Sequence, residues 1–103
     1  MKETISKIRA ALEEAYQEHN RLDSIFGTNK MRIETWEREI EFIKQHPKYK
    51  APLDKDILDS HIKDETEFNL EIVEKIYALE DFIKSLEKTC SVAETLEEKY
   101  LED

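Results

Sequence analysis

Residues that end helices are concentrated at one place in this sequence. Its 103 residues include one glycine and two prolines, and both prolines lie between residues 46 and 54. Proline has no backbone N–H and disfavours helix in the residue before it, so a helix must end close to Pro47. Sandwiches, barrels and doubly wound α/β folds need a turn about every ten residues. The sequence therefore predicts an all-α protein.

A heptad repeat of apolar residues runs along each side of the prolines. Positions a and d of such a repeat face a partner helix. With Ile5 at a, ten of the twelve a and d positions up to Ile43 are apolar, and so are ten of the twelve between Leu58 and Tyr100. The a and d positions of each repeat form an apolar stripe along the helix, which we call its seam. Two seams of similar length joined by a short connection favour a long antiparallel helical hairpin that resembles a coiled coil.

The expected organisation is one helical domain that covers residues 1–103. Its first helical segment covers about residues 2–46, its loop residues 47–53, and its second helical segment about residues 54–102. Asp54 is a good residue to cap the second segment, because Asp is favoured just before a helix begins.

A second interpretation breaks the first segment at Gly27-Thr28-Asn29. Glycine is common just after a helix, and Thr or Asn just before the next one, so a turn at residues 27–29 would give a three-helix bundle. The heptad phase nevertheless continues through Gly27, and an interior glycine costs a helix only about 1 kcal/mol. The sequence leaves the hairpin and the three-helix bundle both open.

Polar residues within the seams indicate the pairing. In a hairpin, the numbers of facing residues should add up to about 100, which brings Asn29, Glu65 and Asn69 close to one level. A polar seam residue often fixes the register of a helix pair, so we expect this role here. The same rule places His19 near Asp81, and we expect His19 to bond to a carboxylate or water.

Acidic side chains are concentrated in the second half of the chain. The net charge is −9, and residues 54–103 hold six basic and sixteen acidic side chains. Such a surface repels nucleic acid and anionic lipid, so we expect a protein partner with a basic face and no direct contact with nucleic acid or membrane. The single cysteine, Cys90, cannot form an internal disulfide, which favours a cytoplasmic location.

The residue types that enzymes need are missing or scattered. A glycine-rich phosphate loop cannot be built with one glycine, and His19, His46 and His61 are too far apart in sequence to suggest a zinc site. Cys90 lies at a seam position, where a buried thiol is ordinary. We therefore expect no enzyme, no catalytic, metal or cofactor-binding residue, and no cofactor.

Two groups of residues are candidates for protein contacts. The larger one combines apolar residues outside the seam with neighbouring carboxylates: Phe68, Val73, Tyr77, Phe82, Asp64, Glu67, Glu71 and Glu74. A lone hairpin would leave these apolar side chains in water, so we expect a homodimer. The basic and aromatic loop residues Lys48, Tyr49 and Lys50 are the second candidate contact.

The functional expectation is a non-enzymatic protein–protein interaction module. It would be a small acidic helical adaptor, scaffold or inhibitor that covers a partner surface. The alternative is an acidic nucleic-acid mimic that inhibits a nucleic-acid-binding enzyme, as the anti-restriction and anti-CRISPR proteins of phages and mobile elements do. The second segment carries one net charge per roughly 7 Å, against about 1.7 Å in duplex DNA, which favours the first expectation.

Overall fold

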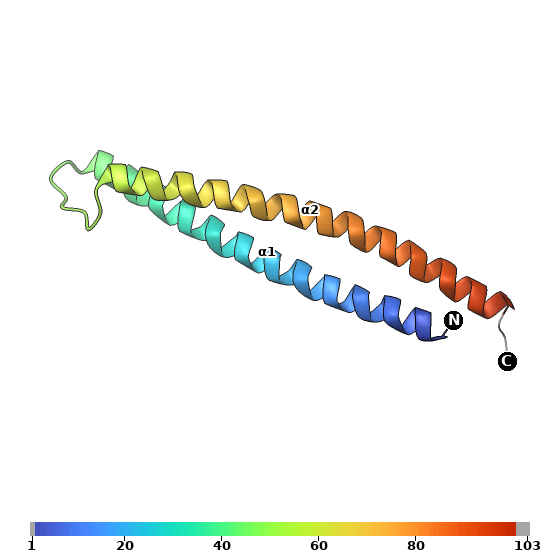
Figure 1. The fold of residues 1–103 in the computed structure, drawn as a ribbon. Helices are drawn as coiled ribbons and strands as arrows, with labels where there is room; N and C mark the ends of the chain where they lie inside the picture. Colours follow the sequence, from blue (N-terminus) through green and yellow to red (C-terminus); the bar gives the residue numbers. More distant parts are fainter. Residues whose placement is uncertain (1, 101–103) are drawn as a thin grey trace. The chain divides into compact units, whose positions relative to one another are not determined.

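The computed structural model describes residues 2–100, and it consists of two α-helices with one connection. Helix α1 spans Lys2–Gln45 and helix α2 spans Lys55–Tyr100 (Figure 1). No described residue is in a strand. The predicted all-α hairpin is confirmed. The last positions of the expected second segment, 101 and 102, lie outside the described residues.

The three-helix alternative is wrong, because α1 continues through Gly27. Neither Gly27 nor any other described residue has a positive φ, so this glycine takes an ordinary helical conformation. A methyl group added at Gly27 would meet no atom within 4 Å. Since the first segment does not turn, no third helix within residues 2–100 covers the apolar residues outside the seam.

The connection is held to the end of α1 by aromatic packing. The Phe42 and His46 rings stack with centroids 4.1 Å apart, and the Tyr49 ring meets Phe42 edge-on at 4.8 Å. The next helix then begins one residue after Asp54, whose carbonyl accepts the backbone N–H of Leu58 at 3.0 Å. Asp54 therefore lies at the N-cap position that the sequence predicts.

The chain divides into two compact units, which we describe separately. The loop unit comprises residues 23–74, and the terminal unit comprises residues 2–22 and 75–100. The expectation of a single domain stays a prediction. Each unit contains a segment of α1 and a segment of α2, and contacts in each show that the two segments run antiparallel.

The loop unit contains a buried polar pair within its apolar seam. Asn29 and Asn69 are both buried, and Asn29 Nδ2 donates to Asn69 Oδ1 at 3.0 Å. Asn69 Nδ2 also donates to the Phe26 carbonyl at 3.3 Å. The third polar seam residue, Glu65, pairs with Arg32 at 3.8 Å. The polar seam residues of this unit therefore bond to one another or to α1, in the register that the sequence predicts.

The terminal unit has a seam that is buried more deeply on one side than on the other. Its core contains Leu12, Ala15, Ile83 and Cys90, all buried. The seam residues Ile8, Leu79 and Leu86 pack against this core but are only partly buried. These three occupy d positions of the heptad, next to the g positions of each helix. The terminal unit therefore exposes apolar seam atoms on its d and g side.

Candidate functional site

Four carboxylates form a continuous stripe on α2 in the loop unit. We call Asp64, Glu67, Glu71 and Glu74 the acidic stripe. Their spacing of three or four residues places them on one side of the helix, at the c and f positions opposite the seam. All four are exposed. Within residues 2–100, none of the four takes part in an ion pair.

The apolar residues of the larger candidate surface do not share one side of α2. Phe68 and Phe82 lie at g positions, whereas Val73 lies at e and Tyr77 at b, which are on the other side of the seam. Phe68 and Val73 belong to the loop unit, and Tyr77 and Phe82 belong to the terminal unit. Val73 is half-buried and the three aromatic residues are exposed. The four apolar residues of the larger candidate group therefore do not form one continuous surface.

The loop candidates differ in how they are held. Lys48 and Lys50 are exposed, and neither forms an ion pair within the described part of the chain. Tyr49 packs edge-on against Phe42. Its partial burial, together with the nearby Glu39 carboxylate, raises the pKa of the Tyr49 phenol. Tyr49 thus packs against the end of α1 while remaining partly exposed, and the two lysines beside it are exposed and unpaired within the described residues.

A row of glutamates on α2 bonds to α1 along one side of the terminal unit, and the sequence reasoning missed it. Glu80, Glu87 and Glu94 lie at consecutive e positions, and we call them the glutamate ladder. Each holds a different side chain of α1. Arg9 Nη2 lies 3.1 Å from Glu94 Oε1, the Tyr16 hydroxyl donates to Glu87 Oε2 at 2.5 Å, and His19 Nε2 lies 3.0 Å from Glu80 Oε2.

The ladder corrects the expected partner of His19. The sequence places His19 near Asp81, but the ring bonds to Glu80 instead. Residue 80 is an e position that borders the seam, whereas residue 81 is an f position on the outer side of the helix. The seven-residue spacing of the three glutamates was the signal in the sequence that could have revealed the ladder.

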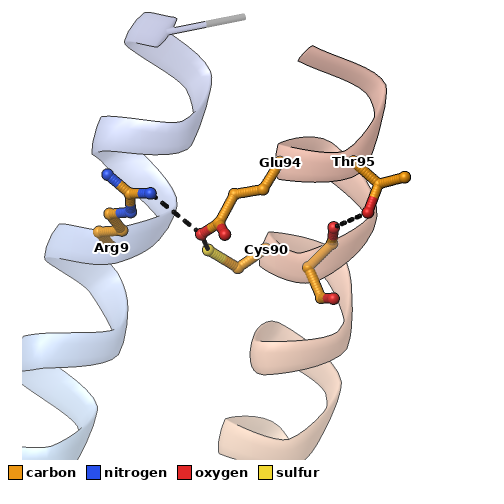
Figure 2. A network of polar contacts seen from close by, with 5 residues as sticks. Arg9, Cys90, Glu94 and Thr95 are labelled. Atoms are coloured by element: carbon orange, nitrogen blue, oxygen red, sulfur yellow. Dashed lines mark hydrogen bonds and ion pairs between the residues drawn. The ribbon is translucent and has the colours of Figure 1, made fainter. Parts of the chain in front are cut away.

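Glu94 at one end of the ladder binds two donors. Figure 2 shows Arg9 and the Cys90 thiol meeting the same carboxylate, with Cys90 Sγ 3.1 Å from Glu94 Oε1. The bonds from Cys90 and Arg9 lower the pKa of Glu94. The bond to Glu94, together with burial, raises the pKa of the Cys90 thiol. Cys90 therefore stays a protonated thiol, and the thiolate is the form that reacts as a nucleophile.

The opposite side of the terminal unit carries two open hollows, whose linings combine apolar residues with the charged residues Glu18, Arg21, Lys75 and Lys88. We call the following residues the apolar flank: Ile8, Leu79, Phe82, Leu86, Val92 and Leu96. One hollow, of about 380 Å³, lies between Thr4 and Ile8 of α1 and Val92 and Leu96 of α2. The other is lined by Leu79 and Phe82 together with residues of α1 that include Glu18.

The exposed fractions show how much of the apolar flank meets solvent. They are 51% for Phe82, 52% for Val92 and 42% for Leu96. The terminal unit thus has one side where polar bonds join the helices beside two further open hollows, and one side where large apolar side chains are partly exposed.

The described residues show neither a metal-binding cluster nor a membrane-spanning helix. Residues 2–100 contain no group of three or more His, Cys, Asp or Glu side chains placed to hold a metal ion. Neither helix, over its described length, has a stretch apolar enough to cross a membrane. Comparison with protein-family models, with curated proteins and with solved structures found no match to this chain.

Proposed function

We propose that this chain is a non-enzymatic protein–protein interaction module. It acts in the cytoplasm as a small acidic helical adaptor, scaffold or inhibitor, it forms a homodimer, and it covers a surface of a partner with a basic face. The observation that carries the proposal is the acidic stripe, because its four exposed carboxylates have no ion-pair partner within the described residues.

The geometry of the acidic stripe suits a row of basic side chains. Ten residues separate Asp64 from Glu74, which corresponds to about 15 Å at 1.5 Å per residue. Carboxylates that are not already neutralised attract Lys and Arg, and Arg can bind one through two parallel hydrogen bonds. A basic surface that follows one helix over about three turns would therefore satisfy all four carboxylates at once.

The same stripe gives some support to the nucleic-acid mimic as the second candidate. Four charges over about 15 Å correspond to one per roughly 5 Å, compared with about 3.4 Å along one DNA strand and 1.7 Å for the duplex. The regular spacing resembles a phosphate backbone, but the density is lower. The general interaction module therefore remains the first proposal.

The stripe is tested by neutralising it and capturing partners from a lysate of the source cell. In one variant, Asn replaces Asp64 and Gln replaces Glu67, Glu71 and Glu74. In a control of equal net charge, four exposed glutamates of α1 become Gln: Glu14, Glu34, Glu37 and Glu41. We expect the stripe variant to lose partners that the control retains, and mass spectrometry identifies them. Equal capture by both variants would contradict the role of the stripe.

The captured proteins also separate the two candidates. Nucleic-acid-binding enzymes that elute at moderate salt and depend on the stripe would favour the mimic, because such contacts weaken steeply with salt. Structural or assembly proteins that depend on the stripe would favour the adaptor or scaffold.

Self-association is tested separately by light scattering. Each chain has a mass of 12.3 kDa, so we expect a particle of about 25 kDa at 100 µM. The acidic chains repel one another, and salt screens that repulsion, so the dimer should be tighter in 0.5 M than in 0.05 M NaCl. A monomer in both buffers would refute the homodimer.

A further inference from the structure

We infer that the apolar flank of the terminal unit is the homodimer interface, where it packs against the same flank of a second copy around a two-fold axis at the level of Ala11 and Thr89. This inference rests on the self-association proposed above and names the surface and register that produce it. The acidic stripe and the loop lysines belong to the other unit and are left for other partners.

The choice of side follows from how differently the two sides of the terminal unit are bonded. On one side, the glutamate ladder already binds Arg9, Tyr16 and His19. In a two-fold dimer, this side would meet the same side of the second copy. That would place glutamates near glutamates and remove water from polar groups whose hydrogen bonds are already made, which is unfavourable. On the other side, Phe82, Val92 and Leu96 each remain about half exposed, and covering them is favourable.

The apolar flank is complementary to itself. Phe82, Thr89 and Leu96 are consecutive g positions of α2, so Thr89 lies midway between the two large side chains. A two-fold axis that crosses the helices at Thr89 lays α2 of one copy antiparallel on α2 of the other. Each Phe82 then meets Leu96 of the second copy, beside the hollow that Leu96 lines with Val92. The contact occurs twice, as a two-fold interface requires.

The residues of α1 follow the same symmetry. Thr4, Ala11 and Glu18 are consecutive g positions of this helix, and Ala11 lies midway between the other two. The axis therefore crosses Ala11 in α1 and Thr89 in α2, where small side chains let the copies approach. Glu18 would meet Thr4 of the second copy, whose hydroxyl can donate a hydrogen bond to the carboxylate.

A two-fold axis parallel to the helices would give a worse match. It would lay α2 of one copy on α1 of the other without changing the level along the helices. Glu18 lines the same hollow as Phe82, so Phe82 would then lie on Glu18 of the second copy. Glu18 already pairs with Arg21, and burying this ion pair under a phenyl ring costs free energy, because the ring cannot replace the lost water. The crossing axis avoids this contact.

The size of the flank also fits a second copy. With the axis at Thr89, residues 78–100 of the two copies overlap over about 33 Å at 1.5 Å per residue, and two helices side by side are about 20 Å wide. The overlap therefore offers an area of about 660 Å² on each copy. A stable interface of ordinary size buries about 600–1,000 Å² on each partner.

The first test is a symmetric disulfide at the axis. Thr89→Cys in a Cys90→Ala background places the only thiols of the two copies next to each other, within the range a disulfide can bridge. The matched control is Ser91→Cys in the same background, two residues away at an exposed b position. We expect Thr89→Cys to form disulfide-linked dimer at least about tenfold faster under mild oxidation. Equal rates would overturn the proposed axis.

The second test keeps the inference falsifiable if a cysteine variant does not fold. Phe82→Ser should weaken the dimer at least about tenfold in analytical ultracentrifugation, whereas Tyr77→Ser should leave it unchanged. Tyr77 is the matched control because it is 64% exposed and lies at a b position away from the flank. Circular dichroism establishes that both variants are helical.

The two proposals fail in different ways. If the unaltered chain is a monomer at 100 µM, the self-association itself is refuted, and this inference fails with it. If the unaltered chain is a dimer that Phe82→Ser does not weaken, the homodimer stands and only its assignment to the apolar flank is refuted. If Phe82→Ser and Tyr77→Ser weaken it equally, the flank is again refuted.

Discussion

The bonded pair Asn29–Asn69 predicts a strong departure from additivity. Both side chains are buried, at 4% and 7% exposure, and they share a hydrogen bond of 3.0 Å. Asn29→Leu leaves the Asn69 carbonyl oxygen buried without its donor. Asn69→Leu leaves the Asn29 amide buried without its acceptor. A buried polar group that loses its partner costs about 1–3 kcal/mol, so each single variant should be destabilised by about that amount.

The double variant removes both polar groups at once. Replacing two bonded partners by apolar groups of similar size is nearly neutral or stabilising. We therefore expect the free energy of unfolding of the double variant to lie within about 1 kcal/mol of the parent value. The double variant should thus be more stable than the sum of the two single changes would predict. Its helix pair should also be less specific in register, because a polar seam residue disfavours shifted pairings.

Urea denaturation followed by circular dichroism measures these free energies of unfolding. All four proteins are compared at one concentration, because self-association makes apparent stability depend on concentration. If the single changes add up to the double change within about 0.5 kcal/mol, the two asparagines are not coupled, and the argument from the buried bond is wrong.

Three further predictions concern single positions. Gly27→Ala should stabilise the protein by about 0.5–1 kcal/mol in the same urea assay, because the new methyl group meets no atom and alanine favours helix; a loss of stability would mean that α1 needs the glycine. Leu58→Ala should cost about 2–5 kcal/mol, since Leu58 is only 2% exposed, whereas Leu53→Ala at an exposed position should cost far less. The pKa of Glu94 is lower in the folded protein than in the unfolded chain, so ionised Glu94 stabilises the fold. This stabilisation is fully present above the unfolded carboxyl pKa of about 4.3, and it is lost as the pH falls through the lower pKa of the folded protein. Thermal melts between pH 2 and 6 should therefore show a smaller acid dependence for Glu94→Gln than for the parent, and identical profiles would contradict this.

The course of the helices could be predicted from sequence because each heptad seam is continuous. Sequence reasoning left open whether the first helix continues through Gly27, and there is a physical reason for this. A glycine is compatible both with a helix end and with a helix interior, so the residue alone does not decide. Whether the helix continues depends on whether neighbouring seam residues such as Phe26 and Asn29 find partners on α2. Asn69 of α2 bonds to the Asn29 side chain and to the Phe26 carbonyl.

The pairing of side chains was predictable only to within about one residue. The expected partner of His19 was residue 81, and the observed one is Glu80. A rule that adds residue numbers gives the level along the helices, but the heptad position decides which side chain at that level borders the seam. The same omission explains why Phe82 and Tyr77 were placed in one candidate group although they lie on different sides of α2.

The position of the connection also sets an order in which the chain can close. The bonds of Asn69 to Asn29 and to the Phe26 carbonyl join residues 40 and 43 positions apart, whereas the bonds of the glutamate ladder join residues 61, 71 and 85 positions apart. Each doubling of loop length adds about 0.6 kcal/mol to the entropy cost of closure. When the helices pair first beside the prolines, each later contact closes a shorter free loop. The buried pair Asn29–Asn69 can therefore fix the register of the helices before the glutamate ladder forms. Helix pairing would then extend from the connection towards the termini, and a wrong register could be corrected while only a few residues are paired.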